Sequence, residues 1–178
     1  MKKLFIFLAA VCLLGFISCT AKKEGGLSAT AQKNIDANRA IAKCFETKDF
    51  SKIGDYIADD AVDHAGMNGE TKGLAAIKSD LEAMAAAMSD LKYEFLKELA
   101  DDEYAMMWMR MTATMKSDMM GMKAGDKVDS RAIELCRFKD GKMVEHWTFM
   151  DPAEMMKMMG GGVPAQLPAD STNGPAQQ

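Results

Sequence analysis

The sequence has little proline, few aromatic residues and no excess of positive charge. Only 4 of its 178 residues are proline, and phenylalanine, tryptophan and tyrosine together make up 7%. Acidic residues outnumber basic ones by 26 to 22, which gives a net charge of −4. Because domains that bind nucleic acid present a basic face, we expect no nucleic-acid partner. The 48% of hydrophobic residues is enough for one ordinary domain with its own core.

Cysteine is also scarce, with four residues in the chain. Cys44 and Cys136 fall in segments with periodic apolar residues, where a buried free thiol is the simplest expectation. A disulfide between them is the alternative, because an exported protein meets an oxidising environment. No spacing of cysteine and histidine resembles a zinc site, and we expect neither a metal nor a cofactor.

The one long uncharged apolar run lies at the N-terminus. Lys2 and Lys3 precede the stretch from Leu4 to Ile17, which is shorter than the roughly 20 residues that span a membrane. This pattern predicts a secretory signal peptide over residues 1–18.

The end of that run, Phe16-Ile17-Ser18-Cys19, resembles the lipidation motif of bacterial lipoproteins. We therefore expect a lipid on Cys19 and a lipid-anchored linker over residues 19–29. The protein would then lie in the cell envelope, held to a bilayer in the periplasm or at the cell surface. Ordinary cleavage nearby, with Cys19 as an incidental thiol, is the alternative.

The first half of the remaining chain shows helical patterning. Apolar residues predict a helix over 28–47, a short helix over 50–58 and a short strand over 61–65. A further helix is predicted by apolar residues at spacings of three and four, namely Leu74, Ile77, Leu81, Met84 and Met88.

In the second half the apolar period changes to two. Strands are predicted over residues 91–99, 104–116, 128–138 and 143–150, the last two joined at Asp140-Gly141. A short helix over 152–159 and a disordered tail over 160–178 follow. Helices segregated from a run of strands indicate an α+β domain, in which a curved antiparallel sheet carries the helices on its concave face.

Several segments resemble, in the same order, the SnoaL-like family of polyketide and ester cyclases in the nuclear transport factor 2-like superfamily. The stretch "DAVDHA" from Asp60 resembles the family's "D-x-V-D-H" strand, and "RFKDGKMVEHW" from Arg137 is the most specific match. The resemblance implies a cone-shaped domain over residues 30–159. It also implies a cofactor-free reaction in which an acidic side chain removes a proton next to a carbonyl group.

This chain differs from the cyclases at the position of their acidic residue. In those enzymes an acidic residue directly follows the His-Trp pair of the last strand, and here that position is Thr148. A threonine hydroxyl is no general base near neutral pH without an activating partner.

His146 is the first site candidate. In the family's register its strand face looks into the cone, and Glu134 on the neighbouring strand or Asp151 just past the last strand could partner it. A histidine with a carboxylate partner can shuttle a proton; the alternative is that these residues are hydrogen-bonded structural groups. The expected pocket residues are His64 (at the mouth), Met109, Met111, Met115, Val144, His146, Thr148 and Met150.

The leading interpretation is an exported lipoprotein whose domain binds a small apolar molecule in the cone. An ester cyclase-like enzyme using His146, Glu134 or Asp151 is the first alternative. A metal-handling or interaction domain is the second, because 18 methionines offer soft ligands for copper(I), although methionine also suits adaptable apolar packing. Dimers through the sheet face are common in the superfamily, so a second copy is an expected partner, with Trp147 facing away from the pocket.

Overall fold

The computed structural model describes residues 26–66, 69–119 and 121–158. The signal peptide, Cys19, most of the linker and the tail proposed from the sequence lie outside the described residues. Within the part of the chain that is described, no helix is long and apolar enough to cross a membrane.

Three α-helices accompany the sheet. α1 (Ala29–Thr47) begins at Ser28, whose hydroxyl accepts a 3.0 Å hydrogen bond from the Ala31 amide, a standard N-cap. α2 covers Leu74–Ala86 and α3 covers Pro152–Met158. The short helix predicted over 50–58 is wrong, because only a single 3-10 turn forms there, η1 (Ile53–Asp55), and the chain enters a strand two residues later.

Six strands form one sheet in the spatial order β2-β1-β6-β5-β4-β3. Their bounds are β1 (Ile57–Asp63), β2 (Thr71–Lys72), β3 (Met88–Ala100), β4 (Tyr104–Met115), β5 (Lys127–Lys139) and β6 (Lys142–Met150). The α+β class is confirmed, but the sheet is mixed rather than antiparallel, because β1 runs parallel to β6. Alternating polarity predicts a strand and says nothing of the direction of its neighbour.

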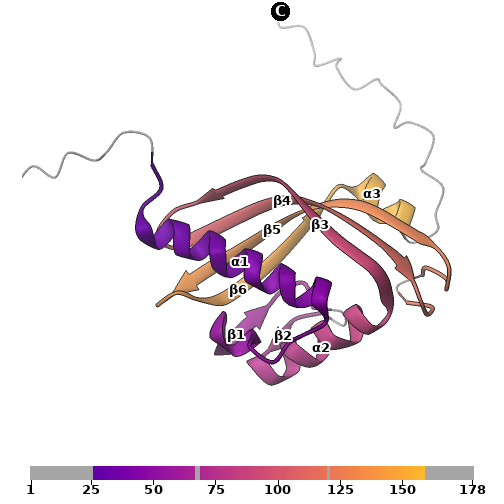
Figure 1. Cartoon of the computed structure of the whole chain (residues 1–178), viewed down its shortest axis with the longest axis horizontal. Coiled ribbons are helices and arrows are strands. Elements are labelled where there is room, and N and C mark those ends of the chain that lie inside the picture. The colour runs from indigo at the N-terminus through magenta and orange to yellow at the C-terminus, as the bar shows by residue number, and fades with distance from the viewer. Residues whose placement is uncertain (1–25, 67–68, 120, 159–178) are drawn as a thin grey trace, which may run out of the picture.

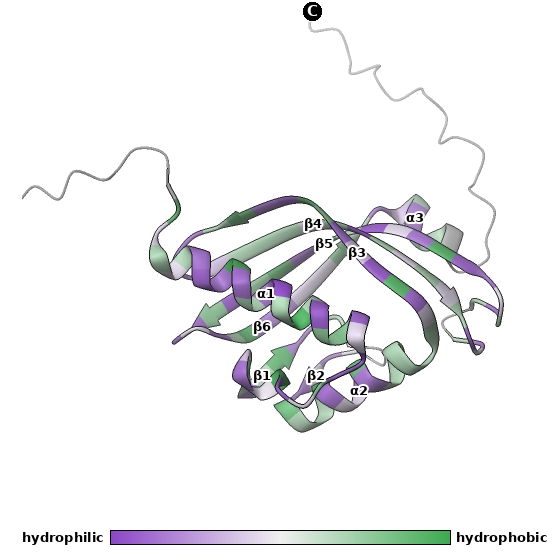
Figure 2. Ribbon diagram, in the orientation of Figure 1, coloured by the Kyte–Doolittle hydropathy of each residue, from purple (hydrophilic) through white to green (hydrophobic). Residues whose placement is uncertain are grey.

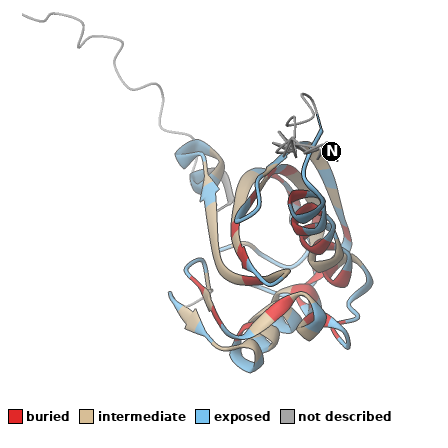
Figure 3. Cartoon of the chain, turned by 90° about the vertical axis from the view of Figure 1, so that its left-hand side faces the viewer, coloured by how far each residue is buried: buried red, intermediate tan, exposed pale blue. Residues whose placement is uncertain are grey.

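Extra residues in β3 bend the sheet. The pairing of β3 with β4 shifts register twice, between Ser89 and Lys92 and between Phe95 and Lys97, and such bulges kink a strand and increase its twist. The long strands therefore curl around α1, which lies along the concave face (Figure 1) and is seen nearly end-on inside the curve in Figure 3.

The core lies between that concave face and the helices. Ile53, Ile57 and Ile77 are no more than 2% exposed, and burial of each contributes about 1.5–3 kcal/mol. Hydrophilic and hydrophobic segments alternate along α1 (Figure 2), as expected for a helix with one face on the sheet and the other in solvent.

The outer face of the sheet is also rich in apolar side chains. Register places Trp108, Ile133 and Phe149 side by side on β4, β5 and β6, and the next row holds Met106, Leu135 and Trp147. Trp108 and Phe149 are 44% and 53% exposed. We call these six residues the outer apolar patch.

Candidate functional site

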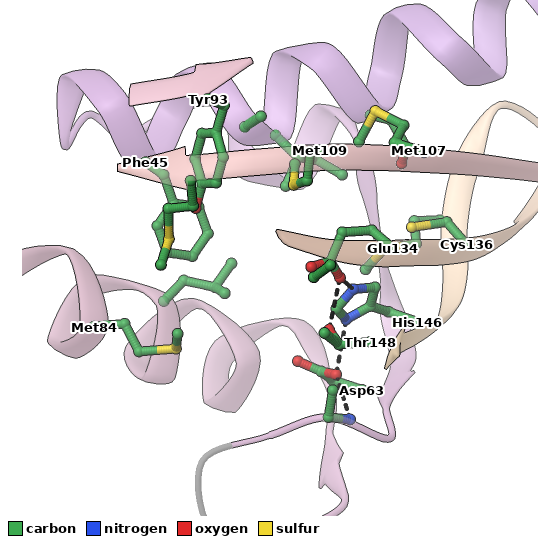
Figure 4. Close-up of a pocket in the computed structure, with 18 of the residues that line it drawn as sticks. Phe45, Asp63, Met84, Tyr93, Met107, Met109, Glu134, Cys136, His146 and Thr148 are labelled. Carbon is green, nitrogen blue, oxygen red and sulfur yellow. Dashed lines mark hydrogen bonds and ion pairs between the residues drawn. The ribbon is translucent and has the colours of Figure 1, made fainter. Parts of the chain in front are cut away.

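A cavity of about 260 Å³ opens between the concave face of the sheet and the helices α1 and α2. Most of its wall is apolar, with methionine as the commonest side chain: Met84, Met107, Met109, Met111, Met143 and Met150 line it. Phe45 and Tyr93 pack edge to face with ring centroids 6.3 Å apart, on the side of the cavity away from His146 (Figure 4). The apolar wall favours a ligand that is itself mostly apolar.

One wall of the cavity is polar and consists of Asp63, Glu134, His146 and Thr148. His146 Nδ1 lies 2.9 Å from Asp63 Oδ1, and His146 Nε2 lies 2.6 Å from Glu134 Oε2. Thr148 Oγ1 donates a 2.6 Å hydrogen bond to the same Glu134 oxygen. We call these four residues the polar cluster; Figure 4 shows them as one connected chain of contacts.

Three strands bring the polar cluster together. Glu134 on β5 is the direct register partner of Thr148 on β6, and Asp63 on β1 is the parallel partner of His146. Since directly paired residues point to the same side of a sheet, all four side chains reach the concave face. The contact of Asp63 with His146 joins positions 83 residues apart in sequence.

The polar cluster carries charge although its ionisable side chains are largely buried. Burial alone would lower the pKa of His146, but its hydrogen bonds to Asp63 and Glu134 outweigh burial and raise the pKa to about 10. Burial would raise the pKa of Asp63, yet the hydrogen bond and charge of His146 bring it below its usual value. At neutral pH, therefore, His146 is an imidazolium ion that cannot accept another proton.

Five of the predicted pocket residues line the cavity: Met109, Met111, His146, Thr148 and Met150. Val144 does not, because β6 carries one extra residue at this point. Phe138 pairs with Met143 whereas Arg137 pairs with Glu145, so Val144 is the additional residue of a bulge. The bulge reverses the alternation, and Met143 faces the cavity where Val144 was expected.

His64 and Met115 also lie outside the cavity wall. Asp63 takes the inward position beside His146, so the next residue points the other way: the His64 ring stacks on Trp147, with centroids 4.8 Å apart, and its Nδ1 lies 3.0 Å from Glu70. Met115 is buried at the end of β4, opposite Met88.

Asp151 is separated from the cluster. It is exposed, and its carboxylate accepts a 2.8 Å hydrogen bond from the Ala153 amide at the start of α3. Of the three catalytic candidates, the structure brings His146 and Glu134 together and places Asp151 at a helix cap.

Sequence reasoning missed Asp63, Asn38 and Tyr93. Asp63 could have been found from alternation, because Ala61 and Asp63 are both buried on β1. Asn38 lines the cavity from α1 at 2% exposure, and its side-chain nitrogen has no hydrogen-bond partner among the described residues other than the weakly accepting Cys136 sulfur. Burial and the nearby Glu134 and Glu46 raise the pKa of Tyr93, so its hydroxyl stays protonated.

Cys44 and Cys136 are buried free thiols, which confirms the first expectation and contradicts the alternative of a disulfide between them. Among residues 26–66, 69–119 and 121–158, no group of three or more His, Cys, Asp or Glu side chains could hold a metal ion. Copper binding through methionine sulfur remains a prediction.

A curved six-stranded sheet with helices on its concave face and one mainly apolar cavity defines the nuclear transport factor 2-like class of α+β cones. The family sequence model described as SnoaL-like polyketide cyclase matches residues 35–159, and the chain belongs to this family. No curated protein matches the chain.

Solved structures share the fold at low sequence identity. TsrD from Streptomyces laurentii superposes with a TM-score of 0.64 at 14% identity, covering 76% of this chain and 98% of TsrD. A SnoaL-like polyketide cyclase from Agrobacterium tumefaciens gives 0.62 at 20% identity, covering 71% and 98%. AclR from Streptomyces galilaeus gives 0.60 at 24% identity, covering 73% and 97%.

Proposed function

We propose that this domain binds a small, mainly apolar molecule in the cavity, with one polar group of the ligand against Glu134 and Thr148. The observation that carries the proposal is an apolar cavity with a single polar wall. Its volume of about 260 Å³ is just below the range of about 300–1,000 Å³ usual for drug-sized ligands. The ligand is accordingly small, on the scale of a single substituted ring.

Two features of the wall support binding. The methionine side chains are flexible and polarisable, so they adapt to a ligand and contact aromatic rings favourably. The amide nitrogen of Asn38 is buried with no partner among the described residues other than the weakly accepting Cys136 sulfur, so a stronger acceptor from a ligand or water would stabilise it.

The test is native mass spectrometry of the purified protein, followed by thermal shift with a panel of one-ring aromatic compounds. Ala132 lines the cavity two residues before Glu134, so Ala132→Leu should fill the space and abolish binding. Ala76→Leu, at an exposed position of α2, is the matched control and should bind like the wild type. Absence of any bound or added ligand, or equal binding by both variants, would contradict the proposal.

A cofactor-free proton-transfer enzyme is the second candidate, and the position of Glu134 favours it. Glu134 stands directly opposite Thr148, which occupies the position of the acid in the cyclases. Both hydrogen bonds that the described residues make to Glu134 end on Oε2. The other oxygen, Oε1, could take a proton from a carbon next to a ligand carbonyl, leaving an enolate that is protonated again from the same carboxyl group.

Proton exchange tests this candidate without knowledge of the substrate. In D₂O, an active site of this kind exchanges the α-hydrogens of a small ketone such as cyclohexanone, which NMR follows directly. Glu134→Gln should lower the rate of exchange by at least about 100-fold, whereas Asp151→Asn should leave the rate unchanged. Exchange that survives in the Glu134 variant, or none in the wild type, counts against the enzyme.

We further propose that the chain is exported and anchored through a lipid on Cys19. The basic start, the apolar run and the residues before Cys19 support this. In bacterial cells, Cys19→Ala should move the protein from the membrane to a soluble fraction, and Cys44→Ala, a buried thiol, should not. Unchanged membrane association of Cys19→Ala would show that the anchor lies elsewhere.

A further inference from the structure

The chain of contacts from Asp63 through His146 to Glu134 has a fixed net charge. Each ring nitrogen of His146 meets a carboxylate oxygen, at 2.9 Å and 2.6 Å. Each contact needs one proton between its two atoms, because a nitrogen lone pair and a carboxylate oxygen are both acceptors and repel. Two protons shared by one imidazole ring and two carboxylates leave a net charge of −1, whichever atom carries each proton.

No positive side chain offsets this charge inside the cavity. Among the described residues that line it, none is lysine or arginine. A single negative charge in an apolar cavity acts over a longer range than it would in water, because little solvent screens it. The cavity therefore repels anions and attracts cations.

The hydrogen-bonding groups of the polar cluster point to the same class of ligand. Both nitrogens of His146 are engaged by carboxylates, and Thr148 uses its proton on Glu134. What remains for a ligand is the second oxygen of Glu134, the second oxygen of Asp63 and the lone pairs of Thr148, which are all acceptors. A ligand must bring a donor to this wall.

The cavity also contains a buried amide, that of Asn38, whose hydrogen-bonding capacity is not fully used, which favours a bound molecule. Asn38 is 2% exposed and lines the cavity, and its side-chain nitrogen has no partner among the described residues other than the weakly accepting Cys136 sulfur. This observation is independent of the charge of the cluster. Because an amide N–H donates, it fits a water, or a ligand that carries an acceptor in addition to its ammonium group.

We propose that the cavity selects small amines with an apolar or aromatic body, the ammonium group lying against Glu134 and the body among the methionines. The inference rests on the proposed binding function and names its ligand class. A hydroxyl group is a weaker substitute for the ammonium, since it donates without charge. A carboxylate of the same shape is excluded.

A series with one constant body tests the charge preference: benzylamine, benzyl alcohol, toluene and benzoate, titrated into the purified full chain at pH 7 and followed by calorimetry or ligand-observed NMR. We expect benzylamine to bind at least tenfold more tightly than toluene, benzyl alcohol to fall between them, and benzoate not to bind. Equal affinities, or tighter binding of benzoate, would overturn the ligand class while leaving the binding function in place. If no member of the series binds, and no compound with a hexyl chain in place of the ring binds either, both the ligand class and the binding function are overturned.

Substitution of Glu134 tests the origin of the preference. Glu134→Gln keeps the size of the side chain and removes its charge, so the preference for benzylamine over toluene should fall at least tenfold. Toluene affinity should stay the same, which also reports that the cavity is intact. Asp63→Asn removes one charge from the β1 side and should act in the same direction.

The matched control is Glu145→Gln. Glu145 lies on β6 as well, but its carboxylate pairs with Arg137 at 2.6 Å and does not line the cavity. This variant should keep the wild-type preference. If both Glu134→Gln and Asp63→Asn retain that preference, the proposal is wrong.

Discussion

Glu134 and Thr148 face each other across β5 and β6, and the threonine hydroxyl donates a 2.6 Å hydrogen bond to the glutamate carboxylate. In the cyclases that this chain resembles, an acid occupies the position of Thr148. Here Glu134 on the neighbouring strand carries a carboxylate instead, and the threonine serves as its donor. At this pair of positions the carboxylate is therefore carried by β5 and not by β6.

Thr148→Val should lower stability modestly. The valine keeps the branched shape but loses the hydroxyl, so one hydrogen bond to Glu134 disappears while that from His146 remains. We expect the free energy of unfolding to fall by about 0.5–1.5 kcal/mol, measured by urea denaturation. Thr112→Val, on the outer side of β4, is the control; an equal loss there would mean that the hydrogen bond to Glu134 contributes nothing specific.

Stability should depend on pH through His146. Its pKa is raised from 6.5 to about 10, so its stabilising effect is complete below pH 6.5 and is lost as pH rises towards 10. A tenfold change in proton affinity between the folded and unfolded states corresponds to about 1.4 kcal/mol. The free energy of unfolding should therefore fall by a few kcal/mol across this window.

Denaturation at a series of pH values from 6 to 10 checks this slope. His146→Gln should be less stable at pH 6 and nearly independent of pH over the window. His64→Gln, which changes the chain's other histidine outside the cavity, should keep the wild-type slope. At the acid end, the lowered pKa of Asp63 predicts stability that is lost as pH falls below about 4.

The outer apolar patch should mediate self-association. Its six side chains form two rows across three strands, with Trp108 and Phe149 half exposed, and such contiguous apolar surfaces usually bind a partner. We expect a symmetric dimer of two copies. Light scattering coupled to size-exclusion chromatography should show twice the monomer mass, and Trp108→Glu should give a monomer.

Leu27→Glu is the control for the dimer, because Leu27 is equally exposed, at 51%, but lies before α1 and away from the patch. It should leave the mass unchanged. A wild-type protein that is still monomeric at a concentration of about 100 μM would contradict the prediction, because a stable interface forms well below that concentration.

The two buried thiols should be inert in the folded protein. Burial raises the pKa of Cys44 and, more strongly, that of Cys136, and the thiolate is the reactive form. Iodoacetamide at pH 8 should modify neither residue until denaturant is added, when mass spectrometry should show both labelled. Rapid labelling of native Cys136, which lines the cavity, would mean that the cavity admits reagent and solvent more freely than its packing indicates.

Much of the fold followed from local patterns. The stripe from Leu74 to Met88 predicted α2, which starts at Leu74 but ends at Ala86, so that Met88 already belongs to β3. The alternation along β4 predicted that strand nearly to the residue, because the strand period is set by the backbone itself. The Asp140-Gly141 turn also behaved as predicted, with positive φ at both residues, 53° and 78°.

The candidate site was harder, because it depends on contacts between distant strands. The parallel pairing of β1 with β6 decides that Asp63, and not His64, joins His146. Asp63 and His64 are adjacent in sequence, and the register of β1 against β6 decides which of them contacts His146, 83 residues from Asp63. For the same reason the sequence left Glu134 and Asp151 as alternative partners of His146, and the structure pairs His146 with Glu134.

Val144 determines which of its neighbours on β6 face the cavity. As the surplus residue of this strand, it allows Met143 and His146 to face inward together although three positions separate them. Deletion of Val144 would leave Met143 and His146 two positions apart, and regular alternation would then keep both facing the cavity. A one-codon deletion at Val144 should thus spare the lining of this cone, because the position that it removes is one that regular strand pairing does not need.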